Sequence, residues 1–171
     1  MPRTLLKPLL KPDFYFDSVF QVPYDRLYEQ GVRGLIFDID NTLASHADKR
    51  PHSKTVALVK RLKKMGFHIG LLSNNSAKRL EAFNEVMQLP GASMAAKPFT
   101  PALRRLMQEM KVSSEETAII GDQLFADIWC GKRVGITTVL VKPITEKEVI
   151  TARIKRGLER RMLKRYYEPG V

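Results

Sequence analysis

Four short apolar runs constrain this chain more than any other feature. They span residues 35–37, 67–72, 117–121 and 135–141. Each run is mostly apolar instead of alternating between apolar and polar residues, which indicates strands that are buried on both faces. Amphipathic segments with helical periodicity separate the runs. We therefore predict an α/β fold: a doubly wound, Rossmann-like parallel sheet between two layers of helices, three layers in all.

The segments between the runs predict the helices. Four longer helices are expected, over residues 53–64, 77–88, 101–111 and 126–133. Ser53 is the candidate N-cap of the first of them. A shorter helical turn is expected from Tyr24 to Gln30, whereas the four prolines of residues 1–24 predict an irregular segment whose aromatic residues pack on the domain.

Polar residues follow three of the predicted strands. Asp38 and Asp40 end the first, Ser73 and Asn74 end the second, and Asp122 ends the third. Side chains two residues apart on an extended strand lie on the same side, so the first two carboxylates repel each other unless a cation or a shared proton compensates. Taken alone, that pair fits either a metal site or two solvated turn acids. Because ligands bind at the carboxyl ends of strands in such sheets, the convergence of all three ends favours a site.

The charge of the chain predicts an anionic partner. Its formal net charge is +11, from 29 Lys and Arg against 18 Asp and Glu. Nucleic acid, the ribosome, anionic phospholipid and a phosphorylated substrate all fit this charge, and composition does not choose among them. The single Cys130 excludes an internal disulfide and fits a reducing cytoplasm. No apolar run approaches the roughly 20 residues of a membrane span, and the proline-rich N-terminus does not resemble a signal peptide.

The C-terminal segment has the pattern of a basic amphipathic helix. Ile150, Ile154, Leu158 and Met162 recur every fourth residue, and Lys and Arg fill many of the positions between them. One interpretation is a helix that packs on the sheet and exposes a solvated basic face. The other is a surface helix that binds an anionic membrane or ribosomal RNA.

Four motifs together resemble the haloacid dehalogenase (HAD) superfamily of phosphotransferases. They are Asp38-Ile-Asp40-Asn41-Thr42, Ser73-Asn74, Lys97-Pro98, and Gly121-Asp122-Gln123-Leu124-Phe125-Ala126-Asp127. They occur in the superfamily's order, over roughly residues 31–142. More narrowly, the first and last motifs resemble the YqeG family of subfamily IIIA, which is related to phosphatidylglycerophosphate phosphatases. Asn41 departs from the Gly that many HAD phosphatases have at this place, and this subset shows Asn.

The resemblance implies a role for each motif residue. Asp38 would attack phosphorus to give an aspartyl-phosphate, and Asp40 would protonate the leaving oxygen and then accept a proton from water. Ser73 and Asn74 would bind phosphoryl oxygens, and Lys97 would stabilise the transition state. Mg²⁺ would be held by Asp38, the Asp40 backbone carbonyl and Asp122, with Asp127 in support. Thr42 would orient the loop, and among the histidines only His46 lies near enough in sequence to reach the substrate.

The spacing of the motifs leaves no room for a cap domain, the insertion with which many HAD enzymes enclose small substrates. An open site suits a phosphate on a bulky molecule: a lipid headgroup, a protein or a nucleic-acid end. Since the basic tail and the apolar N-terminal segment fit a phospholipid, we expect a Mg²⁺-dependent phosphatase of a bulky or lipid-linked phosphate, with phosphatidylglycerophosphate as the candidate. Two alternatives stay open: a HAD-fold protein that binds ribosome or RNA, and a phosphatase of soluble nucleotides or sugar phosphates. The expected organisation is an N-terminal extension (1–30), a HAD-like catalytic domain (31–142) and a basic C-terminal helix (143–171). The expected location is the cytoplasm, with peripheral membrane contact left open.

Overall fold

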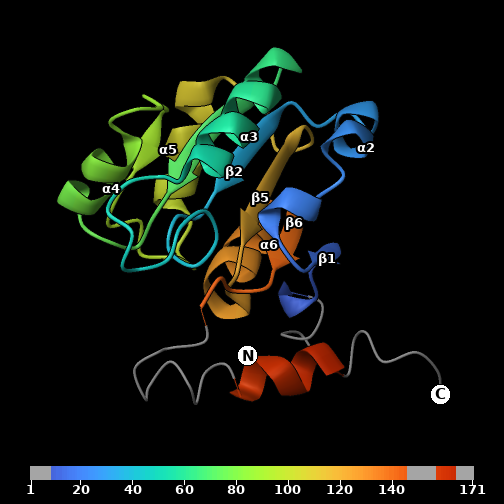
Figure 1. The fold of residues 1–171 in the computed structure, drawn as a ribbon. Helices are drawn as coiled ribbons and strands as arrows, with labels where there is room; N and C mark the ends of the chain where they lie inside the picture. Colours follow the sequence, from blue (N-terminus) through green and yellow to red (C-terminus); the bar gives the residue numbers. More distant parts are fainter. Residues whose placement is uncertain (1–8, 146–156, 165–171) are drawn as a thin grey trace.

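A six-stranded, all-parallel sheet forms the centre of the protein. The computed structural model describes residues 9–145 and 157–164 (Figure 1). The strands are β1 (Phe14–Phe16), β2 (Gly34–Phe37), β3 (His68–Leu72), β4 (Gly91–Ala92), β5 (Thr117–Gly121) and β6 (Thr137–Val141). The helical segments are η1 (Val19–Gln21), α2 (Tyr24–Glu29), α3 (Ser53–Lys64), α4 (Ala77–Asn84), α5 (Pro101–Met110), the π-helical η2 (Leu124–Ile128) and α6 (Trp129–Val134).

The order of the strands creates a switch point beside β2. The order across the sheet is β1-β6-β5-β2-β3-β4, so the chain builds outward from β2 through β3 to β4 and then returns to the other side of β2 with β5. The carboxyl ends of β2 and β5 therefore form the crevice in which such sheets bind ligands. Asp38 follows β2 and Asp122 follows β5, so both acids lie at this crevice.

Helices cover both faces of the sheet, which confirms the predicted doubly wound fold (Figure 1). Neighbouring residues of a strand point to opposite faces, so Leu35 and Phe37 pack with α2, α3 and α4, while Ile36 packs with α5 and α6. Only a loop and α3 separate β2 from β3, and only α4 and β4 lie between β3 and Lys97. Within residues 9–145, therefore, no cap domain is inserted between the motifs.

Strand β1 was not expected from the proline-rich N-terminal segment. It pairs in parallel with β6, and Asp13 fixes its start by accepting hydrogen bonds from the backbone N–H and hydroxyl of Thr138, both at 2.9 Å. Lys132 also pairs with Asp13. A strand of three residues carries too short a pattern to be recognised from sequence.

Several helix boundaries differ from those predicted: α2 and α5 each end one residue earlier, and α6 begins at Trp129 instead of residue 126, after the π-helical η2. Ser53 is the first residue of α3 and not its N-cap, a position that His52 occupies. Helix α4 ends at Asn84 instead of Gln88, because the Asn84 side chain bonds both the N–H and the carbonyl of Leu89 and so closes the turn.

Residues 157–164 are helical, as predicted for this part of the C-terminal segment. Met162 and Leu163 pack against a small cluster of Leu124, Ile128 and Leu140, whereas Leu158 is 54% exposed. Ile150 and Ile154 lie outside the described residues, so the role of the full apolar stripe stays a prediction. No helix in the described parts of the chain has the length and apolar character needed to span a membrane.

Candidate active site

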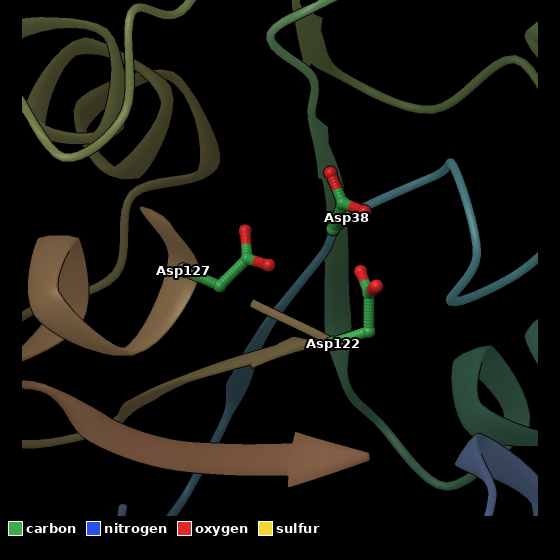
Figure 2. A group of neighbouring side chains, drawn as sticks. All are labelled: Asp38, Asp122 and Asp127. Carbon is green, nitrogen blue, oxygen red and sulfur yellow. The ribbon is translucent and has the colours of Figure 1, made fainter. Parts of the chain in front are cut away.

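Three buried carboxylates converge at the switch point. Asp38 follows β2, Asp122 follows β5, and Asp127 comes from η2 (Figure 2). One oxygen from each of them lies within 4.8 Å of the others. Hard oxygen donors in this number fit a divalent cation such as Mg²⁺, which takes a few protein oxygens and keeps water for the rest.

Lys97 is the cation that the chain itself supplies to these acids. Its Nζ donates to Asp38 Oδ1 at 2.6 Å, to Asp127 Oδ1 at 2.6 Å and to the Leu72 carbonyl at 2.9 Å. Asn74 holds the lysine backbone on both sides, since Lys97 N donates to Asn74 Oδ1 at 2.7 Å and Asn74 Nδ2 donates to the Lys97 carbonyl at 3.3 Å. We call Asp38, Lys97, Asp122 and Asp127 the inner cluster.

The inner cluster carries more negative than positive charge. Burial raises the pKa of Asp38 well above its usual range, Lys97 opposes that rise, and Asp127 and Asp122 add to it. Burial lowers the pKa of Lys97, but the two aspartates that it contacts outweigh this effect and hold that pKa above its usual value. The Lys97 ammonium thus bridges Asp38 and Asp127 with Asp122 close by, and a divalent cation would reduce the repulsion between the three acids.

Two further residues shape the inner cluster. Thr42 lies next to both strand ends, and its hydroxyl is 3.2 Å from Asp122 Oδ1 and 3.4 Å from Asp38 Oδ2. This position agrees with a residue that orients the acids. Gly121 gives Asp127 its space, because a Cβ on Gly121 would lie 2.2 Å from Asp127 Cγ. A larger residue at 121 would therefore displace Asp127.

Asn41 adopts a left-handed backbone conformation, with φ of +63°. Glycine adopts this conformation freely, and Asn tolerates it better than most residues. This accounts for the exchange of Gly for Asn that the sequence comparison with HAD phosphatases noted. The Asn41 side chain also accepts a hydrogen bond from the Thr145 hydroxyl at 2.8 Å, which ties the first motif to the loop after β6.

Asp40 belongs to a second group on the outer side of the site. Arg79 donates to Asp40 Oδ1 through Nε at 3.2 Å and Nη2 at 3.0 Å, and Asn75 Nδ2 donates to Asp40 Oδ2 at 3.2 Å. His46 Nδ1 is 3.6 Å from the same Oδ1. We call Asp40, His46, Asn75 and Arg79 the outer cluster.

Sequence reasoning missed Asn75 and Arg79. The sequence did contain a signal for Arg79. A cation in the first turn of a helix is unfavourable next to the helix dipole, so its presence there indicates a nearby partner that compensates. Helix α4 begins at Ala77, so Arg79 lies in that turn. Asn75 lies in the predicted polar segment but carries no signal that separates it from its neighbours.

A cavity of about 260 Å³ opens between the two clusters. Its lining residues are Asp38, Asp40, His46, Asn74, Asn75, Lys97, Gln123 and Ala126. Ser73 is not among them: it is buried, and its Oγ accepts a hydrogen bond from Asn75 N at 3.0 Å. Cys130 is also buried and lies away from the cavity lining, with burial raising its thiol pKa to about 11.

Comparisons with known proteins relate this chain to HAD phosphatases. A family model described as HAD-hydrolase-like matches residues 94–150. The YqeG protein of Bacillus subtilis, described as a phosphatase, is 31% identical over 159 residues, which is 93% of this chain and 92% of that protein. A chloroplast and mitochondrial phosphatidylglycerophosphate phosphatase of Arabidopsis thaliana is 29% identical over 168 residues, covering 88% of this chain but only 46% of the plant protein.

Solved structures support the fold. A subfamily IIIA HAD hydrolase from Legionella pneumophila aligns with a TM-score of 0.55 at 17% identity, over 74% of this chain and 75% of that one. A HAD enzyme from Bacteroides thetaiotaomicron, solved as a magnesium complex, aligns with a TM-score of 0.53 at 12% identity, over 68% of this chain and 96% of that one.

The parallel sheet, the acids at its carboxyl edge and these relatives define a HAD-superfamily phosphatase. Within that superfamily, the chain belongs to the YqeG family.

Proposed function

We propose that this phosphatase is a Mg²⁺-dependent phosphomonoester hydrolase that works through an aspartyl-phosphate on Asp38. The observation that carries the proposal is the placement of two aspartates on one cavity, each beside a different cation. Asp38 contacts Lys97 in the inner cluster, while Asp40 contacts Arg79 in the outer cluster. Two acids in separate surroundings suit two separate roles, a nucleophile and a proton donor.

In the proposed first step, a carboxylate oxygen of Asp38 bonds to phosphorus and the bond from phosphorus to the leaving oxygen breaks. Asp40 gives its proton to that oxygen. In the second step water attacks the aspartyl-phosphate, Asp40 accepts the proton of the water, and phosphate and the Asp38 carboxylate are released. The ammonium of Lys97 stabilises the charge that develops on the phosphoryl oxygens.

Asp38, the Asp40 carbonyl, Asp122 and Asp127 would hold the Mg²⁺. The bound ion would offset negative charge on the acids and on the phosphoryl group. The donor set of the inner cluster supports this assignment, since its oxygens converge and its charge is unbalanced. The magnesium complex of the Bacteroides neighbour is consistent with it.

A bulky, lipid-linked phosphate is the substrate class that we favour, with phosphatidylglycerophosphate as the candidate. The cavity has no cap over it, and the activity of the plant relative points to this lipid. Two exposed apolar residues lie close in the chain to Lys97: Met94 is 70% exposed and Phe99 is 63% exposed. Met94 N donates to the carbonyl of Asn75, which lines the cavity, and Phe99 follows Lys97 by two residues. Apolar groups beside a polar site suit contact with a lipid surface.

The test measures phosphate release from anionic vesicles containing phosphatidylglycerophosphate, with Mg²⁺ and with a chelator, beside a panel of soluble phosphomonoesters. We expect release that requires Mg²⁺ and that Asp38→Asn reduces by at least about a thousandfold, since the substitution removes the nucleophile but keeps its shape. Turnover by Asp38→Asn like that of the wild type would refute the mechanism. A preference for soluble esters would refute the lipid substrate, and RNA binding without any hydrolysis would favour an interaction protein.

A further inference from the structure

We propose that Arg79 is a positioning residue for Asp40, and that hydrolysis depends on it most when the leaving group must receive a proton. The inference rests on the proposed function, because it assigns Arg79 a part in the proton transfer made by Asp40. It adds a residue that lies outside the four motifs and outside the cavity lining.

Arg79 connects Asp40 to two points of the loop between β2 and α3. Besides its two bonds to Asp40 Oδ1, its Nη2 donates to the Ser45 carbonyl at 3.3 Å and its Nη1 donates to the Lys49 carbonyl at 3.2 Å. Four hydrogen bonds therefore connect the guanidinium, which projects from helix α4, to Asp40 and to the two loop carbonyls. Its planar, always charged group suits such a junction better than the single ammonium of a lysine.

The arginine is itself held in place. Its side chain is only 13% exposed, and its Cζ lies 5.5 Å from the centroid of the Phe83 ring, one turn further along α4. Phe83 is fully buried in the core, so the stack anchors the guanidinium to the rigid part of the fold.

These contacts determine where Asp40 can deliver a proton. Arg79 occupies one side of Asp40 Oδ1 and Asn75 holds Oδ2, so the carboxyl group is oriented at both oxygens. Lys97, the cation of the inner cluster, bonds Asp38 and Asp127 instead. Without Arg79 the carboxyl group of Asp40 would lose its charged partner and could rotate away from the leaving oxygen, while the inner cluster would stay intact.

The leaving group provides the test. An alkoxide is a poor leaving group and needs a proton as the bond to phosphorus breaks, whereas 4-nitrophenolate is a stable anion that leaves without one. General acid catalysis is worth about 10²–10⁴-fold where it is needed. Loss of Arg79 should therefore affect an alkyl phosphate far more than 4-nitrophenyl phosphate.

The experiment measures kcat/KM of the full-length protein with Mg²⁺ for glycerol 3-phosphate, 4-nitrophenyl phosphate and vesicles of phosphatidylglycerophosphate. We expect Arg79→Ala to lower kcat/KM for the two alkyl phosphates by about 100-fold and for the nitrophenyl ester by less than about fivefold. Arg79→Lys should recover part of the loss. Lys78→Ala, an exposed neighbour on α4, should behave as wild type.

Three results would overturn the proposal. The first is an equal loss for the alkyl and aryl esters in Arg79→Ala, which would indicate a purely structural role. The second is no loss of kcat/KM for any substrate. The third is an Arg79→Ala protein that no longer hydrolyses the nitrophenyl ester. Asp40→Asn is the reference, since it should show the same selective loss. Failure of the wild type to hydrolyse any of the three substrates would instead refute the proposed function, and the role of Arg79 with it.

Discussion

The inner and outer clusters each contain one aspartate of the first motif and one cation, yet their balance of charge differs. In the inner cluster Lys97 contacts two carboxylates, Asp38 and Asp127, Asp122 lies close to both of these acids, and all four side chains are buried. In the outer cluster a single carboxylate, Asp40, meets Arg79 and the neutral amide of Asn75. The inner cluster thus brings several acids to one point, whereas the outer cluster has a single carboxyl group beside a single guanidinium.

The difference suggests that the two clusters divide the work of the site. Converging buried carboxylates favour binding of a divalent cation, because the cation reduces the repulsion between them. The carboxyl group of Asp40, by contrast, is hydrogen-bonded at both oxygens, by Arg79 and Asn75, and this suits a group that must keep one orientation. If this division is correct, a change in one cluster should leave the property of the other intact.

The largest effect should come from Asp122→Asn. Mg²⁺ at about 100 times its Kd should stabilise the wild type by about 2.7 kcal/mol, and most of this gain should disappear in the variant. Without metal the variant and the wild type should differ in stability by less than this amount, since the lost gain belongs to the Mg²⁺-bound state. Urea unfolding with Mg²⁺ and with a chelator measures both effects.

Arg79→Ala is the matched control for this comparison, because it alters only the outer cluster. It should retain the full stabilisation by Mg²⁺. A loss of that stabilisation in Arg79→Ala, or its persistence in Asp122→Asn, would show that the two clusters do not act separately.

The inner cluster was largely predictable from sequence, and the reason is the geometry of parallel strands. Buried strands deliver the residues that follow them to one edge, so Asp38 and Asp122 could be placed together once the strands were recognised. Lys97 and Asp127 do not end strands and came only from resemblance to the superfamily. The parallel sheet itself followed from the apolar runs.

The outer cluster was less predictable because it depends on loop geometry. The carbonyls of Ser45 and Lys49 meet Arg79 only because the loop between β2 and α3 folds back toward α4, and main-chain acceptors carry no sequence signal. The same reason applies to β1, whose pairing with β6 rests on backbone hydrogen bonds and on contacts of Asp13 with Thr138, far away in the sequence. The periodicity of apolar residues predicts helices and strands, but it does not predict hydrogen bonds between loops that are distant in the sequence.

A second prediction uses the raised pKa of Asp38 in the metal-free protein. The unfolded chain releases the Asp38 proton near the usual value of about 3.9, whereas the folded protein holds it to higher pH because of burial. Between these two values the folded state binds the additional proton, so its stability falls as pH rises, by up to about 1.4 kcal/mol per pH unit. The free energy of unfolding in a chelating buffer, measured across this range, should show that slope.

Asp38→Asn should remove this contribution, because its side chain does not titrate. The stability of the variant relative to the wild type should therefore grow with pH, and saturating Mg²⁺ should flatten the difference. If the free energies of unfolding of the variant and the wild type differed by the same amount at every pH, the folded protein would not hold the Asp38 proton to higher pH. The contrast between the two clusters would then disappear.

The smallest effect concerns Asn41. It lies in the chain between Asp40 of the outer cluster and Thr42, whose hydroxyl contacts Asp38 and Asp122 of the inner cluster. Its φ of +63° costs most residues about 1 kcal/mol relative to Gly. Both Asn41→Gly and Asn41→Ala lose the bond from Thr145, so their difference isolates the backbone conformation. We expect Asn41→Ala to unfold in urea with about 1 kcal/mol less stability than Asn41→Gly, and both to keep the response to Mg²⁺. Equal stability of the two variants would mean that the backbone at residue 41 relaxes out of the left-handed conformation in Asn41→Ala. Residue 41 would then not be a rigid connection between the clusters.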